Sequence, residues 1–115
     1  MDNETIPLVS SSNSDEEPLF LLSLLNNELM SFSWKLINKE YNIGRSSENS
    51  IILDDITVSR KHALLLVSKE NIKIVDNNST NGIYVNNEIT SDSILKSGDK
   101  IQIGKYLLLL TKVMK

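Results

Sequence analysis

Short apolar runs recur along the chain from Leu19 to its end, and asparagine, serine, glycine and aspartate separate them. In Met30–Leu36, apolar and polar residues alternate with a period of two, which is typical of a strand with one buried face. Ala63–Ser68 and Ile72–Val75 are separated by a link of hairpin length. This pattern predicts short β-strands rather than helices.

The predicted strands are bounded by turn residues and follow one another at regular spacing. They are Leu19–Leu25, Met30–Leu36, Tyr41–Ile43, Ile51–Leu53, Ala63–Ser68, Ile72–Val75, Ile83–Val85, Glu88–Ile89, Lys100–Ile103 and Tyr106–Thr111. Asn86-Asn87 suits a two-residue hairpin turn, because asparagine tolerates positive φ. About ten short strands of this kind predict an all-β fold, an antiparallel β-sandwich. For Leu19–Met30, periodicity also permits an amphipathic helix.

The first 17 residues differ from the rest in composition. They are rich in serine and contain five acidic residues but no Lys or Arg: Asp2, Glu4, Asp15, Glu16 and Glu17. A polar segment with so few core-forming residues cannot offset its own ordering entropy. We therefore expect a disordered acidic tail over 1–17, with Pro18 at the boundary, and one folded domain over 18–115.

Composition excludes several classes of function. The chain has no cysteine, which removes disulfides and thiolate metal sites and fits a reducing compartment. The apolar run Leu19–Leu25 is far shorter than the roughly 20 residues of a membrane-spanning helix. Residues 18–115 are close to neutral, whereas non-specific DNA binding needs clustered Lys and Arg. We expect a soluble, cytoplasmic protein that binds neither membrane nor nucleic acid.

Three polar segments between predicted strands carry the candidate chemistry: Ile43–Ser47, Val58–His62 and Asp76–Gly82. Of the 12 basic residues only two are arginine, Arg45 and Arg60, and both lie in these segments. Arginine can hold a phosphate or carboxylate with two parallel hydrogen bonds. By themselves, these arginines could equally be ordinary exposed residues, and the third segment could be a plain turn.

Taken together, the three segments carry more information. Gly44-Arg45, Ser59-x-x-His62 and Ser79-Thr80-Asn81-Gly82, in this order and spacing, resemble the signature of the forkhead-associated (FHA) domain. Leu95–Gly104 is similar to that family's closing segment. The resemblance spans about residues 19–115. It implies two twisted sheets of typically eleven strands, binding loops at one end, and a ligand that carries phosphothreonine.

The resemblance also implies roles for individual residues. It implies that Arg45 and Ser59 contact the phosphate and that Thr80 contributes to the phosphate pocket. Asn81 would hold the peptide backbone beside the phosphothreonine, and Arg60 would contact the phosphate or the peptide. These are the groups that a phosphate requires, since it carries about −1.5 to −2 charge and three strong acceptor oxygens.

Other residues of the motif are expected to support the loops. Gly44 and Gly82 permit close backbone approach or positive φ, and the resemblance implies that His62 braces the loops by hydrogen bonds. Thr57 departs from some family members, which carry a basic residue there to select an acidic residue three positions after the phosphothreonine. Thr57 is uncharged, so acidic selection by that route is not expected.

Three alternatives to a phosphothreonine-binding adaptor follow from the sequence. An enzyme could use Ser59, His62 and Asp54 or Asp55, but no nucleophile elbow, P-loop or metal cluster accompanies them. We therefore expect no catalysis, no cofactor and no metal. A domain of this family could also act in assembly without reading phosphate.

The third alternative concerns regulation by the tail. Thr5 lies in the acidic tail and is a candidate phosphosite, although Asn3–Pro7 lacks the double-threonine motif of small bacterial FHA proteins that block their own pocket. Self-inhibition through a phosphorylated Thr5 competes with the simpler expectation of a solvated tail. The expected partners are phosphothreonine proteins and a Ser/Thr kinase, and the expected oligomeric state is a monomer.

Overall fold

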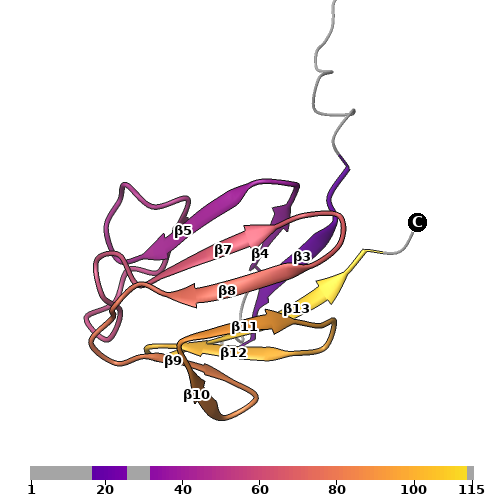
Figure 1. Cartoon of the computed structure of the whole chain (residues 1–115). Helices are drawn as coiled ribbons and strands as arrows, with labels where there is room; N and C mark the ends of the chain where they lie inside the picture. The colour runs from indigo at the N-terminus through magenta and orange to yellow at the C-terminus, as the bar shows by residue number, and fades with distance from the viewer. Residues whose placement is uncertain (1–16, 26–31, 114–115) are drawn as a thin grey trace, which may run out of the picture.

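The computed structural model describes residues 17–25 and 32–113. In these residues eleven strands form two sheets that pack face to face, and no helix is present (Figure 1). Consequently, no described segment is a helix that could cross a membrane.

The first sheet has six strands in the order β10-β9-β12-β13-β3-β4, all paired antiparallel. Its strands are β3 (Phe20–Leu24), β4 (Phe32–Leu36), β9 (Ile83–Val85), β10 (Glu88–Thr90), β12 (Lys100–Ile103) and β13 (Tyr106–Lys112). The long strand β13 lies between β12 and β3, so the last strand of the chain joins the first described strands to the rest of the sheet.

The second sheet has five strands in the order β11-β8-β7-β5-β6. Its strands are β5 (Glu40–Gly44), β6 (Ile51–Ile52), β7 (Ala63–Val67), β8 (Ile72–Asp76) and β11 (Asp92–Leu95). The predicted antiparallel β-sandwich is confirmed, and one pair of strands departs from it, since β5 and β6 pair parallel. The loop between the two strands brings Ile51 back beside Ile43, so that β6 runs in the same direction as the end of β5.

The core lies between the two sheets and consists of the alternate residues that each strand turns inward. In β7 and β8, Ala63, Leu65, Ile72 and Ile74 are buried, while Leu64 and Lys73 between them are partly exposed. The six-stranded sheet contributes Leu22, Leu36, Ile83, Ile101, Ile103, Leu108 and Leu110 to the same cluster. This alternation is why a period of two in the sequence predicts the strands.

Most of the predicted strands are confirmed. The segment Leu19–Leu25 contains β3, so the helical alternative is wrong over Phe20–Leu24, where the residues pair with β13 and β4. Strand β11 was not predicted, because Asp92 and Ser93 have low strand propensity. Pairing with β8 and burial of Leu95 form this strand instead.

The predicted hairpin turn between β9 and β10 is also confirmed. Asn86 and Asn87 have φ of 51° and 74°, which are the left-handed conformations that such a two-residue turn requires. The Asn86 side chain accepts a hydrogen bond from Lys100 N at 3.0 Å and so ties the turn to β12. The predicted tail with Thr5 lies outside the described residues, as does the segment 26–31.

Candidate functional site

The antiparallel register of the five-stranded sheet brings the three candidate loops together. Ile43 pairs with Ala63, and Ala63 pairs with Asp76, so the end of β5, the start of β7 and the end of β8 lie side by side. The loops that leave these strands therefore meet at one end of the sandwich, on the left in Figure 1.

Arg45 lies directly against the second loop. Its backbone N–H donates to the carbonyl of Ser59 at 3.0 Å, and its side-chain Nε donates to the carbonyl of Val58 at 3.0 Å. These bonds hold the first part of the side chain, while the residue as a whole is exposed. The terminal nitrogens of the guanidinium thus remain as charged donors next to the Nε–Val58 contact.

Ser59 links the second loop to the third. Its Oγ accepts a hydrogen bond from the backbone N–H of Thr80 at 2.9 Å. Because a hydroxyl group has one proton and two lone pairs, this contact leaves the proton of Ser59 able to donate. Ser59 is half-buried, and its backbone carbonyl is the group that accepts the hydrogen bond from Arg45 N.

His62 is fully buried beneath the exposed residues of the site, and its ring connects the second loop to the third. Its Nδ1 accepts a hydrogen bond from the Ser59 N–H at 3.0 Å, and its Nε2 lies 2.8 Å from the carbonyl oxygen of Gly82. Because the backbone N–H of Ser59 can only donate, Nδ1 must be the acceptor and carries no proton. The ring proton is therefore on Nε2, which donates to the carbonyl oxygen of Gly82. Both nitrogens are thus engaged in structural bonds.

Gly44 permits a close approach of the first and second loops. A Cβ atom at this position would overlap the carbonyl oxygen of Arg60 and lie 2.8 Å from Asn49 Nδ2. Asn49 is only 7% exposed, and its Nδ2 donates to the carbonyls of Arg60 at 2.7 Å and Ser46 at 2.9 Å. Asn49 was not predicted as a site residue, because one asparagine in a polar turn is indistinguishable from its neighbours without the fold.

The third loop is held by a network around Asp76. Its Oδ1 accepts hydrogen bonds from the hydroxyl and the backbone N–H of Ser79, and Ser79 Oγ accepts one from Gly82 N at 2.9 Å. Two residues adopt left-handed backbone conformations, Asn78 with φ of 56° and Gly82 with φ of 81°. The network leaves Thr80 and Asn81 exposed at the tip of the loop.

Asn81, at the tip of the third loop, contacts the residues that precede Ser59. Its Nδ2 donates to the carbonyl of Thr57 at 2.9 Å, which leaves Oδ1 available as an acceptor. Arg60 is exposed, and within the described part of the chain its guanidinium has no hydrogen-bond partner. The structure therefore places on three adjoining loops all five residues that were predicted as binding groups: Arg45, Ser59, Arg60, Thr80 and Asn81.

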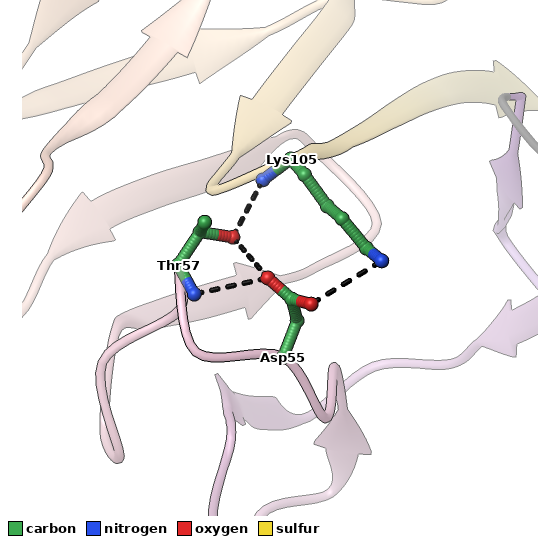
Figure 2. Close-up of polar contacts among 3 residues, drawn as sticks. All are labelled: Asp55, Thr57 and Lys105. Carbon is green, nitrogen blue, oxygen red and sulfur yellow. Dashed lines mark hydrogen bonds and ion pairs between the residues drawn. The ribbon is translucent and has the colours of Figure 1, made fainter.

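Thr57 is part of a second polar cluster beside the site (Figure 2). Thr57 Oγ1 donates to Asp55 Oδ2 at 2.6 Å and accepts from Lys105 N at 2.9 Å. Lys105 Nζ lies 3.2 Å from Asp55 Oδ1. The hydrogen bonds from the hydroxyl and N–H of Thr57 lower the pKa of Asp55 to about 2, so its carboxylate stays ionised.

These contacts disagree with a catalytic triad. Asp55 is bonded to Thr57 and Lys105, and the two ring nitrogens of His62 are bonded to Ser59 N and Gly82 O. No nitrogen of His62 is left to take the proton of Ser59 Oγ. Over residues 17–25 and 32–113, no three His, Asp or Glu side chains form a metal-binding group.

The arrangement is suited to binding an anion with several oxygens. A charged fork from Arg45, a hydroxyl donor from Ser59 and a second exposed cation from Arg60 lie on adjoining loops. Charge-assisted bonds of this kind are stronger than bonds between neutral groups. Asn81 adds an amide oxygen that can accept a hydrogen bond from a peptide backbone.

Comparison with known families gives a match over this part of the chain. Residues 41–104 match a family model described as FHA domain. The matched segment begins in β5 and ends after β12, so it contains all three loops.

One curated relative is the oxoglutarate dehydrogenase inhibitor of Corynebacterium efficiens. It is 48% identical over 65 residues, which make up 56% of this chain and 46% of the relative. The chain thus spans about half the length of the curated relatives that it matches.

Solved structures agree in fold. The FHA domain of the CT664 protein from Chlamydia trachomatis superposes with a TM-score of 0.78 at 28% identity, covering 84% of this chain and 99% of that one. A structure described as an analysis of phosphothreonine-dependent FHA domain interactions gives a TM-score of 0.75 at 26% identity, with the same coverage.

Proposed function

The chain belongs to the FHA domain family, and from that premise we propose that it binds phosphothreonine-containing segments of other proteins. It would act as a signalling adaptor or regulator downstream of a Ser/Thr kinase. The observation that carries the proposal is that three loops meet at Ser59. The Ser59 hydroxyl accepts a hydrogen bond from Thr80 N, and Arg45 donates hydrogen bonds to the backbone carbonyls of Val58 and Ser59.

In this proposal each exposed group has one task. Arg45 and Ser59 donate to the phosphate oxygens, and Thr80 contributes to the phosphate pocket. Arg60 adds a second positive charge toward the phosphate or the peptide. Asn81 binds the peptide backbone through the side-chain amide oxygen that its bond to Thr57 leaves available. Gly44, His62 and Gly82 support the loops and do not contact the ligand.

The protein would be a binding module without catalytic activity. A relative named as an inhibitor of an enzyme supports a regulatory role. The engaged nitrogens of His62 support the absence of acid–base chemistry at Ser59. We propose that the protein acts in the cytoplasm as a monomer, and the lack of cysteine fits a reducing compartment.

The proposal is tested by measuring the affinity of one peptide in three forms: with phosphothreonine, with phosphoserine and without phosphate. We expect the wild type to bind only the phosphorylated forms, and phosphothreonine most tightly. Arg45→Ala should lower affinity by about tenfold to a hundredfold, since each charge-assisted bond contributes roughly 1.5–3 kcal/mol. Circular dichroism should show an unchanged fold, because Arg45 is exposed.

Two matched variants show whether the loss of affinity in Arg45→Ala comes from the guanidinium group itself. Arg45→Lys keeps the charge but loses the planar fork and the Nε bond to Val58, so it should restore only part of the affinity. Lys96→Ala removes an exposed charge distant in the chain from the three loops and should have no effect. Equal binding of the phosphorylated and unphosphorylated peptides would favour an assembly domain instead.

Regulation by the tail is a further part of the proposal. A phosphorylated Thr5 tethered to its own domain would have an effective concentration of roughly millimolar, so that even weak binding could block other ligands. The test compares phosphopeptide affinity of the full chain, phosphorylated on Thr5, with that of residues 18–115. Weaker binding by the phosphorylated full chain supports self-inhibition, and equal affinities contradict it.

A further inference from the structure

Two adjoining hollows lie on the outer face of the six-stranded sheet, next to the candidate site. The first has a volume of about 320 Å³ and is lined by residues that include Thr57, Asn81 and Lys105. The second has a volume of about 450 Å³ and is lined by residues that include Asn87 and Lys100. Tyr84 and Gln102 line both hollows, so the two form one groove.

The register of the strands shows how this groove runs. Tyr84 of β9 pairs directly with Gln102 of β12, whereas Ile83 and Ile103 beside them are buried in the core. Tyr84 and Gln102 therefore project from the outer face of the sheet. Because β9 and β12 run side by side from the binding loops toward the Asn86-Asn87 turn, the groove follows these strands (Figure 1).

The groove begins at residues of the candidate site. Asn81 lines its first hollow, and the bond from Asn81 Nδ2 to the Thr57 carbonyl spans the loops at that end. A peptide bound by Asn81 would therefore continue directly into the groove, because Asn81 belongs to both the candidate site and the first hollow. At roughly 3.3 Å for each extended residue, the distance from Asn81 to Asn86 corresponds to about five residues of peptide.

The lining has the chemistry of a peptide groove. Tyr84 is 37% exposed and offers an aromatic surface with a polar tip. Gln102 uses its Nε2 on the carbonyl of Gly104 at 3.3 Å, which leaves its amide oxygen as an acceptor for a backbone N–H. Lys100 is exposed, and no acidic side chain of the described residues pairs with it.

We propose that this groove binds the segment of the phosphorylated partner that lies beyond the residues immediately flanking the phosphothreonine. The inference rests on the proposed function, which it extends from a phosphate pocket to a longer recognition surface. The bound segment would be extended, would place an apolar or aromatic side chain against Tyr84, and would carry an acidic side chain near Lys100. Specificity for the partner would then depend on β9 and β12 as well as on the loops.

The experiment uses the full chain and phosphothreonine peptides of two lengths. The core peptide has about three residues on each side of the phosphothreonine, and the long libraries add about five randomised residues on one side or the other. After selection on the wild type, the best long peptide is compared with its own core. We expect it to bind at least about fivefold more tightly, with acidic and apolar residues enriched in the added part.

Variants of the groove then identify where the added residues bind. Tyr84→Ala and Gln102→Ala should each reduce the advantage of the long peptide and leave the affinity of the core peptide unchanged. Ile94→Ala is the matched control, because Ile94 is an exposed apolar residue on β11 of the other sheet. It should preserve the advantage in full.

The possible failures are distinct. If the core peptide binds the wild type but no added position is enriched, the groove proposal is wrong and the phosphothreonine proposal stands. The same holds if Tyr84→Ala leaves the advantage of the long peptide intact, or if this variant weakens core and long peptides by one common factor. A core peptide that fails to bind the wild type contradicts the phosphothreonine proposal itself and, with it, the groove proposal.

Discussion

His62 shows how one buried side chain can position an exposed site. It touches no solvent, yet its ring joins the Ser59 backbone to the Gly82 carbonyl and so fixes the second loop relative to the third. A buried polar group is stabilising only while its partners are present. The contribution of His62 therefore lies in the two bonds rather than in any chemistry of the imidazole.

Replacement of His62 by alanine should destabilise the fold and weaken ligand binding. The Ser59 N–H and the Gly82 carbonyl would lose their partners at a cost of about 1–3 kcal/mol each. We expect the free energy of unfolding, measured in urea, to fall by about 2–6 kcal/mol. Lys61→Ala, at the exposed neighbour, is the control. An unchanged free energy in His62→Ala would contradict the role assigned to the ring.

At the scale of elements, the β9–β10 hairpin depends on the backbone of its turn. Asn87 has a φ of 74°, a conformation that costs a residue other than glycine roughly 1–2 kcal/mol, with asparagine among the best tolerated. We expect Asn87→Ala to lower the free energy of unfolding by about 1 kcal/mol. Asn87→Gly should leave it unchanged or raise it. Equal stability of the two variants in thermal unfolding would show that the turn conformation contributes nothing.

The cluster of Asp55, Thr57 and Lys105 joins the loop before Ser59 to the β12–β13 hairpin (Figure 2). It predicts a specific pH dependence. The hydroxyl and N–H of Thr57 lower the pKa of Asp55 from an ordinary 3.8 to about 2. Since the pKa is lower in the folded state, ionised Asp55 stabilises the fold above about pH 4, and this contribution is lost as the pH falls toward about 2.

Asp55→Asn tests this linkage. The variant cannot ionise, so its free energy of unfolding should lie below that of the wild type at neutral pH. The difference should shrink between about pH 4 and pH 2, because protonation of Asp55 removes the same charge from the wild type. Asp54→Asn, at the exposed neighbouring carboxylate, is the matched control. A difference that is constant over this pH range would contradict the lowered pKa.

At the scale of the whole molecule, the region that matches the family model is smaller than the pair of packed sheets. Residues 41–104 exclude β3, β4 and β13, which provide one half of the six-stranded sheet. The buried side chains of Leu22, Leu36, Leu108 and Leu110 would be lost with these strands. Burial of such side chains is the main favourable contribution to folding.

A chain limited to residues 41–104 should therefore fail to fold, whereas residues 18–115 should unfold cooperatively like the full chain. Far-ultraviolet circular dichroism and urea titration of the three chains provide the comparison. We expect the free energies of unfolding of residues 18–115 and the full chain to agree within about 0.5 kcal/mol, since the polar composition of 1–17 predicts a segment outside the folded domain. A cooperative transition in residues 41–104 would place the folding unit within the matched region.

The fold was largely predictable from the chain, and the exceptions have physical causes. Strands such as Lys100–Ile103 alternate polar and apolar residues because one face is buried, and that period is visible in the residue order. β11 was missed because its polar residues become a strand only by pairing with β8. The parallel pairing of β6 with β5 was missed for a similar reason, since direction depends on the path of the loop between them.

The candidate site was predictable in part. The motif residues Arg45, Ser59 and Asn81 were selected from their type and spacing, and the structure brings them onto adjoining loops. Asn49 and Lys105 were not selected. Their importance comes from partners that are remote in the sequence, namely the carbonyl of Arg60 and the side chains of Thr57 and Asp55.

The sequence by itself thus determined the all-β architecture, the family and the residues of the three loops, because periodicity and motif spacing are properties of neighbouring positions. The tertiary structure alone decided which atoms are engaged and which stay available: Arg45 Nε is bonded, and both ring nitrogens of His62 are bonded. It also decided that the groove along Tyr84 and Gln102 adjoins the loops. Hydrogen bonds and surface shape depend on distances between segments, and only packing of the sheets sets those distances.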